Sequence, residues 1–207
     1  MALTKAPLFG LDASGTIAGA IVFSKWKGRN YVRRHAVPSN PKSGLQVGMR
    51  SMFKFVAQDY VNLSAAFVAE WKAIADLTAT TPLNAQMQTA QRNARQNFGA
   101  VKAPSEVAGT TPTAPATLVI GVQPKSLAVS WTDPAVTPGD YTGMLYMSTV
   151  TGFTPDISNL VRVLPVATLA TVITGLVTGT PYYFRFRQTN TDGEIGALIA
   201  QATGTPT

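Results

Sequence analysis

Cysteine is absent from this chain of 207 residues, and histidine occurs once, as His35. Without cysteine there can be no disulfide, no thiolate nucleophile and no zinc site built on thiolates. A single histidine in a basic loop, with no Ser or Asp pattern around it, is far more often an ordinary surface residue than a general base or a metal ligand. The fold must therefore be held together by packing, or by assembly with partners.

Acidic residues are also few, ten in all, and they are scattered along the chain. None shows the spacing D-x-D, E-x-x-H or H-E-x-x-H that would bind a metal or pair a general acid with a base. The segment GTIAGA, residues 15–20, lacks the lysine and the helix of a phosphate-binding loop. We expect no catalytic site, no cofactor and no metal in this protein.

Long apolar runs are missing as well. No stretch approaches the roughly 20 apolar residues that a membrane span needs. The opening residues, MALTKAPLFGLDASG, lack the continuous apolar core of a secretory signal. These absences predict a soluble protein that is made in the cytoplasm and has no membrane partner.

What the chain does contain is an excess of positive charge, +7 overall, most of it in one half. Residues 1–100 carry twelve basic and four acidic side chains, whereas residues 101–207 carry five and six. The charge is densest in residues 24–54, SKWKGRNYVRRHAVPSNPKSGLQVGMRSMFK, which hold eight Lys or Arg and no acidic residue. Halves with such different electrostatics are expected to perform different tasks.

Composition places a boundary between the halves at residues 100–117. This segment, AVKAPSEVAGTTPTAPAT, consists mostly of Ala, Pro, Thr, Gly and Val without apolar periodicity, so it is expected to be a linker. The resulting division is a basic module over residues 1–99, the linker over residues 100–117 and a second domain over residues 118–207. On this division the second domain should fold without the first.

The basic module is expected to begin with a β-hairpin. Residues 16–34 hold two β-rich runs around a turn at residues 27–30. The hairpin and the helices that follow it make a thin core, so residues 1–40 are as well suited to be an arm that orders against a neighbour as to fold alone.

Three short helices are expected after the hairpin. Ser43 and Gln46 form a capping-box pattern at the start of the first helix. The second should begin near Ser64, and the third at Thr81, before a proline, ending at Gly99. The residues expected on the apolar stripe of the first helix are Leu45, Met49, Met52, Phe53, Val56 and Tyr60.

After the linker, β-type runs are separated by turn residues. Seven strands in about ninety residues indicate a β-sandwich, so the fold class is α+β, with the sandwich as a separate domain. The runs are LVIGVQ, SLAVSW, TGMLYMST, LVRVLPV, ATVITGL, PYYFRFRQT and ALIAQAT.

The segment LVTGTPYYFRFRQTNTDG, residues 176–193, combines a leucine, Gly-Thr, a tyrosine, alternating apolar residues and an Asn–Gly turn. It resembles the end of a fibronectin type III domain, and Trp131 lies where that family keeps a core tryptophan on its second strand. The resemblance implies a tyrosine corner. Alternation sends Phe184 and Phe186 inward and Arg185 and Arg187 outward. The expected core residues are Trp131, Leu176, Tyr182, Phe184 and Phe186. A fold of this kind implies no particular function.

The basic stretch carries a second resemblance. Its pattern W-x-G-x-x-Y-V-R, then N-P-x-S-x-x-Q-x-x-x-R-x-x-F, then a helix bearing a tryptophan, is similar to a short module of many phage and prophage proteins. Ser43 replaces a commoner threonine, and Gly48 weakens the helix where the family has a better helix former. The residues that carry the pattern are Trp26, Gly28, Tyr31, Val32, Arg33, Asn40, Pro41, Ser43, Gln46, Arg50, Phe53 and Trp71.

This second resemblance implies a virion component encoded among morphogenesis genes. Fibronectin-like domains are common appendages on phage heads and tails, so both halves imply the same setting. The partners implied are other virion proteins, namely major capsid, portal, neck or tail subunits, with this chain present in many copies or as a homo-oligomer.

Three interpretations of the basic stretch are open. It can be a solvated charged surface, as most charge runs are. It can bind nucleic acid, with Trp26 and Tyr31 stacked on bases, although no DNA-binding signature is present. We favour docking on a neighbouring protein, in which cations pair with carboxylates and aromatic residues supply buried anchors. The candidate docking residues are Trp26, Arg29, Tyr31, Arg33, Arg34 and Arg50.

The sequence therefore predicts a non-enzymatic phage structural protein, located in the virion and made in the host cytoplasm. Its basic module docks on the particle, as a capsid decoration or a head, neck or tail accessory, and displays the β-sandwich outward. The alternative is a nucleic-acid-binding packaging or maturation protein that uses residues 25–54. A cell-surface adhesion module is disfavoured, because no export signal precedes it.

Overall fold

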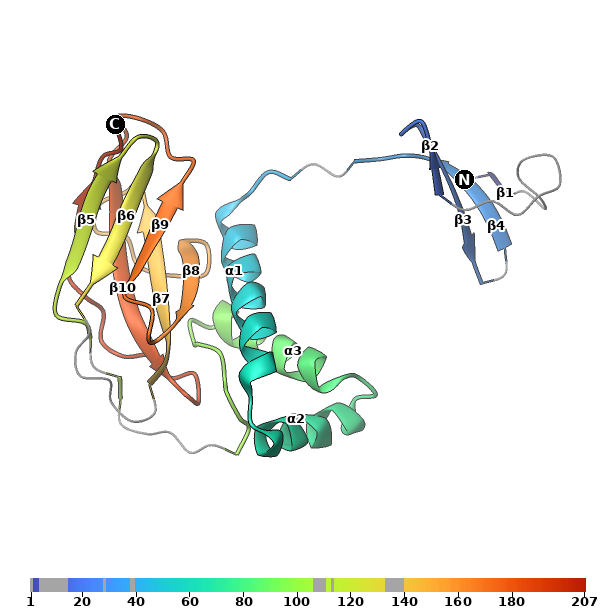
Figure 1. The fold of residues 1–207 in the computed structure, drawn as a ribbon, viewed down its shortest axis with the longest axis horizontal. Coiled ribbons are helices and arrows are strands. Elements are labelled where there is room, and N and C mark those ends of the chain that lie inside the picture. The colour runs from blue at the N-terminus through green and yellow to red at the C-terminus, as the bar shows by residue number, and fades with distance from the viewer. Residues whose placement is uncertain are drawn as a thin grey trace. The chain divides into compact units, whose positions relative to one another are not determined.

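The computed structural model describes residues 2–3, 15–27, 29–37, 40–105, 111–112, 114–132 and 140–207, and at residues 2, 3 and 26 it describes the backbone alone (Figure 1). The chain divides into two compact units, Met1–Pro41 and Lys42–Thr207. The elements of the first unit are β1 (Ala2–Leu3), β2 (Gly15–Ile17), β3 (Ile21–Trp26) and β4 (Arg29–Arg34). Those of the second are α1 (Gly44–Asp59), the 3-10 turn η1 (Tyr60–Asn62), α2 (Ala65–Leu77), α3 (Pro82–Arg95), β5 (Leu118–Gln123), β6 (Ser126–Trp131), β7 (Asp140–Ser148), β8 (Leu160–Pro165), β9 (Ala170–Thr174), β10 (Tyr182–Asn190) and β11 (Ala202–Gly204).

In the described part of the first unit, the strands form one antiparallel sheet in the order β1-β4-β3-β2. Trp26 pairs with Arg29, so only two residues connect β3 to β4. Lys27, the first of these, has a φ of 47°, the left-handed conformation that two-residue hairpin turns use. The hairpin expected over residues 16–34 is therefore present, but Arg29 and Asn30 belong to β4 and not to the turn.

The second unit begins with the helices. The side-chain oxygen of Ser64 accepts the N–H of Phe67 at 3.3 Å, and α2 starts there as expected. Thr81 accepts the N–H of Asn84 at 3.3 Å, and Pro82 opens α3 in the position where its missing N–H costs nothing. Local capping chemistry thus fixes both starts.

The start and the buried face of α1 differ from expectation. Ser43 is the N-cap, but its hydroxyl makes no capping hydrogen bond, so the predicted capping box with Gln46 does not form. Leu45 and Phe53 of the predicted stripe are 49% and 51% exposed. The residues that α1 buries are Gly48, Ser51, Met52, Phe55 and Val56.

Small residues explain this choice of face. A Cβ at Gly44 would lie 2.0 Å from the carbonyl oxygen of Ser158, and one at Gly48 would lie 2.2 Å from that of Ile157. The Ser51 hydroxyl accepts the N–H of Val163 on β8 at 2.7 Å. The glycine-bearing side of α1 can approach backbone of the β-sandwich more closely than a side with larger residues could, and it is the side that packs.

Among the described residues from 114 onward, seven strands form two antiparallel sheets, ordered β5-β6-β9 and β11-β10-β7-β8. The first, second and fifth strands are thus in one sheet and the third, fourth, sixth and seventh in the other. This is the fibronectin type III arrangement, and the predicted α+β fold class with a C-terminal β-sandwich is confirmed.

The core between the two sheets contains the five residues that the sequence placed there, Trp131, Leu176, Tyr182, Phe184 and Phe186. The rings of Trp131 and Phe186 stack with centroids 4.3 Å apart. The Tyr182 hydroxyl accepts the N–H of Val177 at 3.1 Å, which is the tyrosine corner that the resemblance implies.

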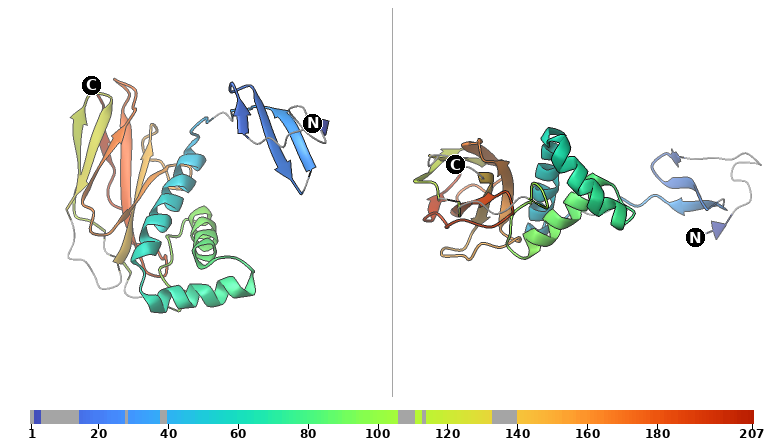
Figure 2. Two further views of the ribbon diagram at one scale, coloured as in Figure 1. Left: turned by 45° about the vertical axis from the view of Figure 1, so that its right-hand side comes forward. Right: turned by 90° about the horizontal axis from the view of Figure 1, so that it is seen from below.

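The larger sheet is buried on its second face as well, by the helices (Figures 1 and 2). Met144 and Tyr146 of β7 alternate with the core-facing Leu145 and point to the helical side. They form one buried cluster with Leu160 and Val163 of β8, Met52, Phe55 and Val56 of α1, and Met87, Ala90 and Ala94 of α3. Helix α2 packs on α3 through Trp71, Ala75 and Ala85.

The structure therefore divides the chain elsewhere than at the predicted boundaries. The helices, assigned from sequence to a module over residues 1–99, share a hydrophobic core with the sandwich assigned to residues 118–207. The division falls between Pro41 and Lys42. A helical layer over one sheet of the sandwich cannot be a separate anchoring module.

The predicted linker, residues 100–117, begins as packed structure. Helix α3 ends at Arg95 and not at Gly99, whose N–H donates to the Gly193 carbonyl at 2.6 Å. The N–H of Lys102 donates to Thr191 at 2.8 Å, and the indole N–H of Trp71 donates to the Lys102 carbonyl at 2.9 Å. Ala100 and Ala103 are fully buried. Residues 106–110 and 113 of the predicted linker lie outside the described residues.

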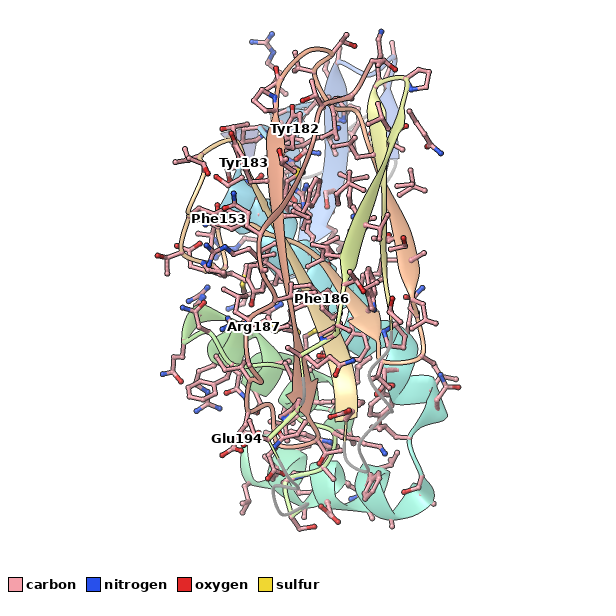
Figure 3. The ribbon with its side chains drawn as sticks, turned by 90° about the vertical axis from the view of Figure 1, so that its left-hand side faces the viewer. Phe153, Tyr182, Tyr183, Phe186, Arg187 and Glu194 are labelled. Atoms are coloured by element: carbon pink, nitrogen blue, oxygen red, sulfur yellow. The ribbon has the colours of Figure 1, made fainter. Side chains whose placement is uncertain are left out.

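Arg187 lies between the larger sheet and the helices and is only 8% exposed; Figure 3 labels it beside Phe186 on β10. Alternation directs it away from the sandwich core, as predicted, but the helical layer covers that side. Its Nε and Nη2 donate to the Tyr146 hydroxyl at 3.0 and 2.7 Å, and Nη2 lies 3.5 Å from the Asn97 carbonyl oxygen. Burial raises the pKa of Tyr146, although the Arg187 charge and hydrogen bond act to lower it.

We expect Tyr146→Phe to lower the free energy of unfolding by about 2 to 3 kcal/mol, because the buried guanidinium loses its main acceptor. Adding Arg187→Met should recover most of this loss, since the charge then disappears too. Urea denaturation of the two single variants and the double variant measures both effects. If the double variant is as unstable as Tyr146→Phe alone, the loss does not come from the unpaired Arg187 guanidinium.

The same pair has an alkaline signature. The folded pKa of Tyr146 lies above its ordinary value of 10.0, so the unfolded chain ionises first. The contribution of the protonated Tyr146 to the free energy of unfolding is fully present below about pH 10, and it is lost as the pH rises through the folded pKa. This part of the alkaline loss should be missing from Tyr146→Phe.

Candidate docking surface

Strand pairing in the N-terminal sheet brings most of the predicted docking residues onto one face. On β4, Arg29, Tyr31 and Arg33 alternate with residues of the other face. Their partners on β3 are Trp26, Ser24 and Val22, and residues directly opposite each other share a face. Position 26 is thus on the same face as Arg29, Tyr31 and Arg33; the side chain of Trp26 lies outside the described part of the structure.

Arg34 belongs to the opposite face. It pairs with Ile21, and the same face carries Phe23 opposite Val32 and Ile17 opposite Ile21. Alternation along β4 separates Arg34 from Arg33, and the register adds that Trp26 shares a face with Arg29 and Arg33. The first face, at positions 26, 29, 31 and 33, is called the arginine face below.

Nothing in the described part of the N-terminal sheet forms an interior. Arg29, Arg33 and Arg34 are exposed, Tyr31 is only half-buried, and no described side chain between residues 15 and 41 is buried. Ile17 and Ile21 remain 47% and 41% exposed. A sheet of this size gains independent stability from a hydrophobic face that packs on something else.

The charged side chains of strands β2 to β4 and of the turn between β3 and β4 all carry positive charge. Residues 15–41 contain Lys25, Lys27, Arg29, Arg33 and Arg34 and no acidic residue. Like charges gathered within about a Debye length of 8 Å repel one another at physiological salt. A surface of carboxylates would remove this repulsion, and arginine can bind carboxylates through two parallel hydrogen bonds.

The other predicted residues are placed elsewhere. Arg50 lies on α1, in the second unit, so it does not belong to the arginine face. His35, the lone histidine, is half-buried, and its backbone N–H donates to the Ala20 carbonyl at 2.7 Å. The described residues hold no group of His, Asp and Glu that could bind a metal ion. Within the same residues, no helix has both the length and the apolar character needed to cross a membrane.

Comparison with solved structures finds fibronectin type III domains and proteins of other descriptions. The fn3 domain of the human collagen alpha-1(XX) chain is 21% identical, with a TM-score of 0.39, over 49% of this chain and 91% of that one. Chicken CNTN1 FN1–FN3 domains are 15% identical, with a TM-score of 0.39, over 46% of this chain and 32% of that one. A beta-1,2-glucanase from Parabacteroides distasonis is 13% identical, with a TM-score of 0.42, over 50% and 14%.

Neither sequence comparison gives a match. No protein-family model matches this chain, and no curated protein matches it. The similarity to known structures concerns the sandwich half, and at these identities it bears on the fold alone.

A second group of cations was not predicted as a group, although three of its four members belong to the basic stretch of residues 24–54. Lys42, Lys54 and Arg162, together with Arg50, line a groove of about 430 Å³ between α1 and strand β8. Arg162 is distant in sequence from the basic stretch, so charge density could not reveal it. The usable signal is the spacing of Gly44, Gly48 and Ser51, which marks the side of α1 that packs on the sandwich.

Proposed function

We propose that this chain is a non-enzymatic structural protein of a phage virion. Its N-terminal sheet docks on the particle through the arginine face, and the second unit is displayed from that attachment. The observation that carries the proposal is the sheet itself, which has exposed Arg29 and Arg33 on one face and no buried side chain among its described residues.

Docking gives this sheet what it lacks. A partner would supply the buried surface against which Tyr31 and the neighbouring apolar residues can pack, and acidic groups that the arginines can bind. An interface of this type has aromatic and arginine anchors at its centre and charges at its rim. The chemistry of the partner surface is therefore acidic, with apolar hollows.

The setting in a virion is supported by the resemblance of residues 26–71 to the phage module. In the structure the later part of that module, on α1 and α2, belongs to the same unit as the sandwich. We therefore assign docking to the sheet and not to all of residues 1–99. The partner is a major capsid, portal, neck or tail subunit, on which the chain is present in multiple copies.

The proposal is tested first on purified particles from the source. Mass spectrometry and gels, before and after nuclease treatment and mild salt stripping, should find the chain at a fixed copy number that survives nuclease. If the chain is absent from particles, the virion role is wrong. If it leaves with the DNA, the cations serve nucleic acid, and the packaging or maturation role replaces docking.

Charge reversal then tests the arginine face. Arg29→Glu with Arg33→Glu should weaken co-sedimentation with particles that lack the chain by about ten- to a hundredfold, because carboxylates would then face carboxylates. Lys25→Glu with Arg34→Glu, on the opposite face of the same sheet and with the same change in net charge, is the matched control and should have a much smaller effect. Equal losses in both variants would reduce the interaction to net charge and contradict docking through one face. Melting of the second unit should be unchanged in all variants.

A further inference from the structure

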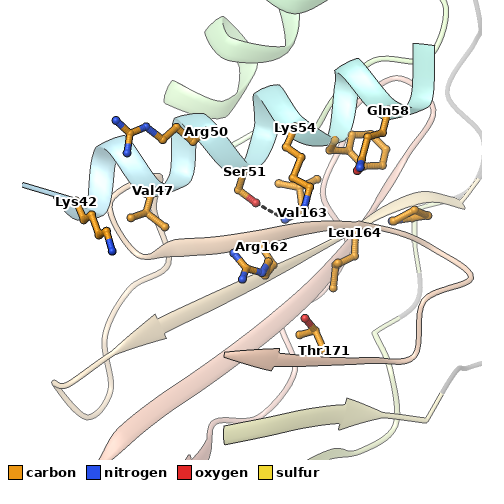
Figure 4. A pocket seen from close by; sticks show the side chains of 12 residues that line it. Lys42, Val47, Arg50, Ser51, Lys54, Gln58, Arg162, Val163, Leu164 and Thr171 are labelled. Atoms are coloured by element: carbon orange, nitrogen blue, oxygen red, sulfur yellow. Dashed lines mark hydrogen bonds between the residues drawn. The ribbon is translucent and has the colours of Figure 1, made fainter. Parts of the chain in front are cut away.

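A second hollow adjoins the groove between α1 and the sandwich. The hollow of about 430 Å³ is lined by Lys42, Arg50, Lys54 and Arg162 and reaches Thr171 of β9. A second hollow, of about 460 Å³, shares Lys42, Val47 and Arg162 with the first and extends along β9 to Ile173 and Thr174. Figure 4 shows α1 above strand β8, with Lys54 on the helix, Lys42 just before the helix begins, and Arg162 on the strand. The two hollows make one trough along β9, called the cationic trough below.

The lining of the cationic trough is basic and apolar. Among the described residues that line the two hollows, four are Lys or Arg and none is Asp or Glu. The apolar part includes Val47, Leu160, Leu164 and Ile173. A ligand that fits must carry negative charge along its length and tolerate an apolar wall.

Strand β9 presents an open edge to this trough. It is the last strand of its sheet, paired only with β6 in the described chain. The N–H of Trp131 donates to the Leu169 carbonyl at 3.0 Å, and hydrogen-bonded pairs alternate along an antiparallel ladder. Thr171 and Ile173 therefore bond to β6, while the backbone groups of Ala170, Val172 and Thr174 point to the other side.

The neighbouring edge, on β8, is closed. The N–H of Val163 is taken by the Ser51 hydroxyl at 2.7 Å, and Pro165 has no N–H to offer. Natural sheets protect their edges by such means. The contrast leaves β9 as the edge of the sandwich on which another strand can form.

We propose that the cationic trough binds an extended acidic peptide segment of a partner protein, which adds a strand to β9. Main-chain hydrogen bonds to Val172 and Thr174 would hold the segment, as in other cases of strand addition. Every second side chain of the added strand faces the trough, so acidic residues at alternate positions meet Lys42, Lys54 and Arg162. This site belongs to the second unit and does not rest on the docking role of the N-terminal sheet.

A peptide fits the trough better than a nucleic acid does. Single strands of nucleic acid bind proteins through aromatic side chains on which bases stack, in addition to charge. The one aromatic residue among the described lining residues is Phe55, and it is 3% exposed. By contrast, the row of backbone N–H and C=O groups at an open strand edge is complementary to the backbone of another strand.

The test uses the full chain and fluorescein-labelled octapeptides in an anisotropy titration. We expect an alternating Thr-Glu peptide to bind, and its isomer TTEETTEE to bind at least about fivefold more weakly, since only alternation places all four carboxylates on the trough side. Methylating the backbone nitrogens of every Thr, or of every Glu, should abolish binding in one case only, because one set faces β9. Loss in both cases, or in neither, overturns strand addition.

Protein variants locate the site. Arg162→Glu with Lys54→Glu should weaken binding of the alternating peptide about tenfold, whereas Lys125→Glu with Lys25→Glu, with the same change in net charge outside the trough, should leave it nearly unchanged. Arg162, Lys25 and Lys125 are exposed, and the melting temperature of each variant checks the fold. Equal weakening by both pairs, or no binding of the peptide to the unaltered chain, overturns the proposal. The proposal is also overturned if a dT20 oligonucleotide binds where the peptide does not, and if Arg162→Glu with Lys54→Glu abolishes that binding. The trough would then be a site for nucleic acid.

Discussion

A fragment of residues 114–207, the sandwich without its helices, is expected to be unfolded or aggregated at room temperature, whereas residues 42–207 unfold cooperatively. The reason is the second buried cluster, in which the sandwich contributes Tyr141, Met144, Tyr146, Phe153, Leu160 and Val163. Each large apolar side chain loses about 1.5 to 3 kcal/mol when it is exposed. The sum is on the order of 10 kcal/mol, as large as the whole stability of a typical domain.

Circular dichroism melts and size-exclusion chromatography of the two fragments decide this point. The fragment 42–207 should melt at the temperature of the second unit in the full chain, which controls for loss of the N-terminal sheet. If residues 114–207 instead form a soluble monomer that melts at that temperature, the sandwich is independent of the helices. The domain boundaries expected from the sequence would then be restored.

The second large effect is expected from one methyl group. Gly48→Ala should lower the free energy of unfolding by about 3 kcal/mol or more. Alanine is favoured over glycine inside a helix by about 1 kcal/mol, so propensity alone predicts stabilisation. The new Cβ, however, would lie 2.2 Å from the backbone carbonyl oxygen of Ile157, which cannot rotate away as a flexible side chain could. The helix must therefore shift, and the cluster beneath it opens.

Thermal and urea unfolding of Gly48→Ala are compared with those of Phe53→Ala. Phe53 lies on the same helix, is 51% exposed, and should cost less than about 1 kcal/mol on replacement. A Gly48→Ala variant more stable than the unaltered protein would show that α1 does not pack closely on residues 157 and 158.

Local pattern predicted the elements well where one short-range rule decides them. Alternation and turn residues gave six strands of the sandwich, whereas of the seventh predicted run, residues 197–203, only Ala202 and Thr203 belong to β11. The Tyr182 pattern gave the corner. Capping residues gave the starts of α2 and α3. In each case the physical cause lies within a few residues of the effect.

The failures have tertiary causes. A stripe of large apolar residues predicts the buried face of a helix only when the packed neighbour leaves room for large side chains. On α1 the backbone of Ile157 and Ser158 lies so close that the side with Gly44 and Gly48 is buried instead. Residues 100–105 have the composition of a linker, yet their backbone groups find partners on Trp71 and at Thr191. Arg187 follows the alternation, but nothing local says that helices will cover it.

The arginine face was half visible in the sequence. Its residue types and density were apparent, but the face depends on pairing. Alternation alone separates Arg33 from Arg34, but only the register, with Trp26 opposite Arg29, places position 26 on the same face as Arg29 and Arg33. The cationic trough was not predictable, because Arg162 joins Lys54 through the packing of α1 on β8.

The short segment between the two units limits the distance between their ends, β4 and α1. Between Arg34, the last residue of β4, and Gly44, the first of α1, there are nine residues, which span at most about 32 Å when extended. If the N-terminal sheet is held on a surface, the second unit is confined to a small volume around it. Short tethers of this kind produce effective concentrations in the millimolar range. A cationic trough with only millimolar affinity for a segment of that surface would then be about half occupied.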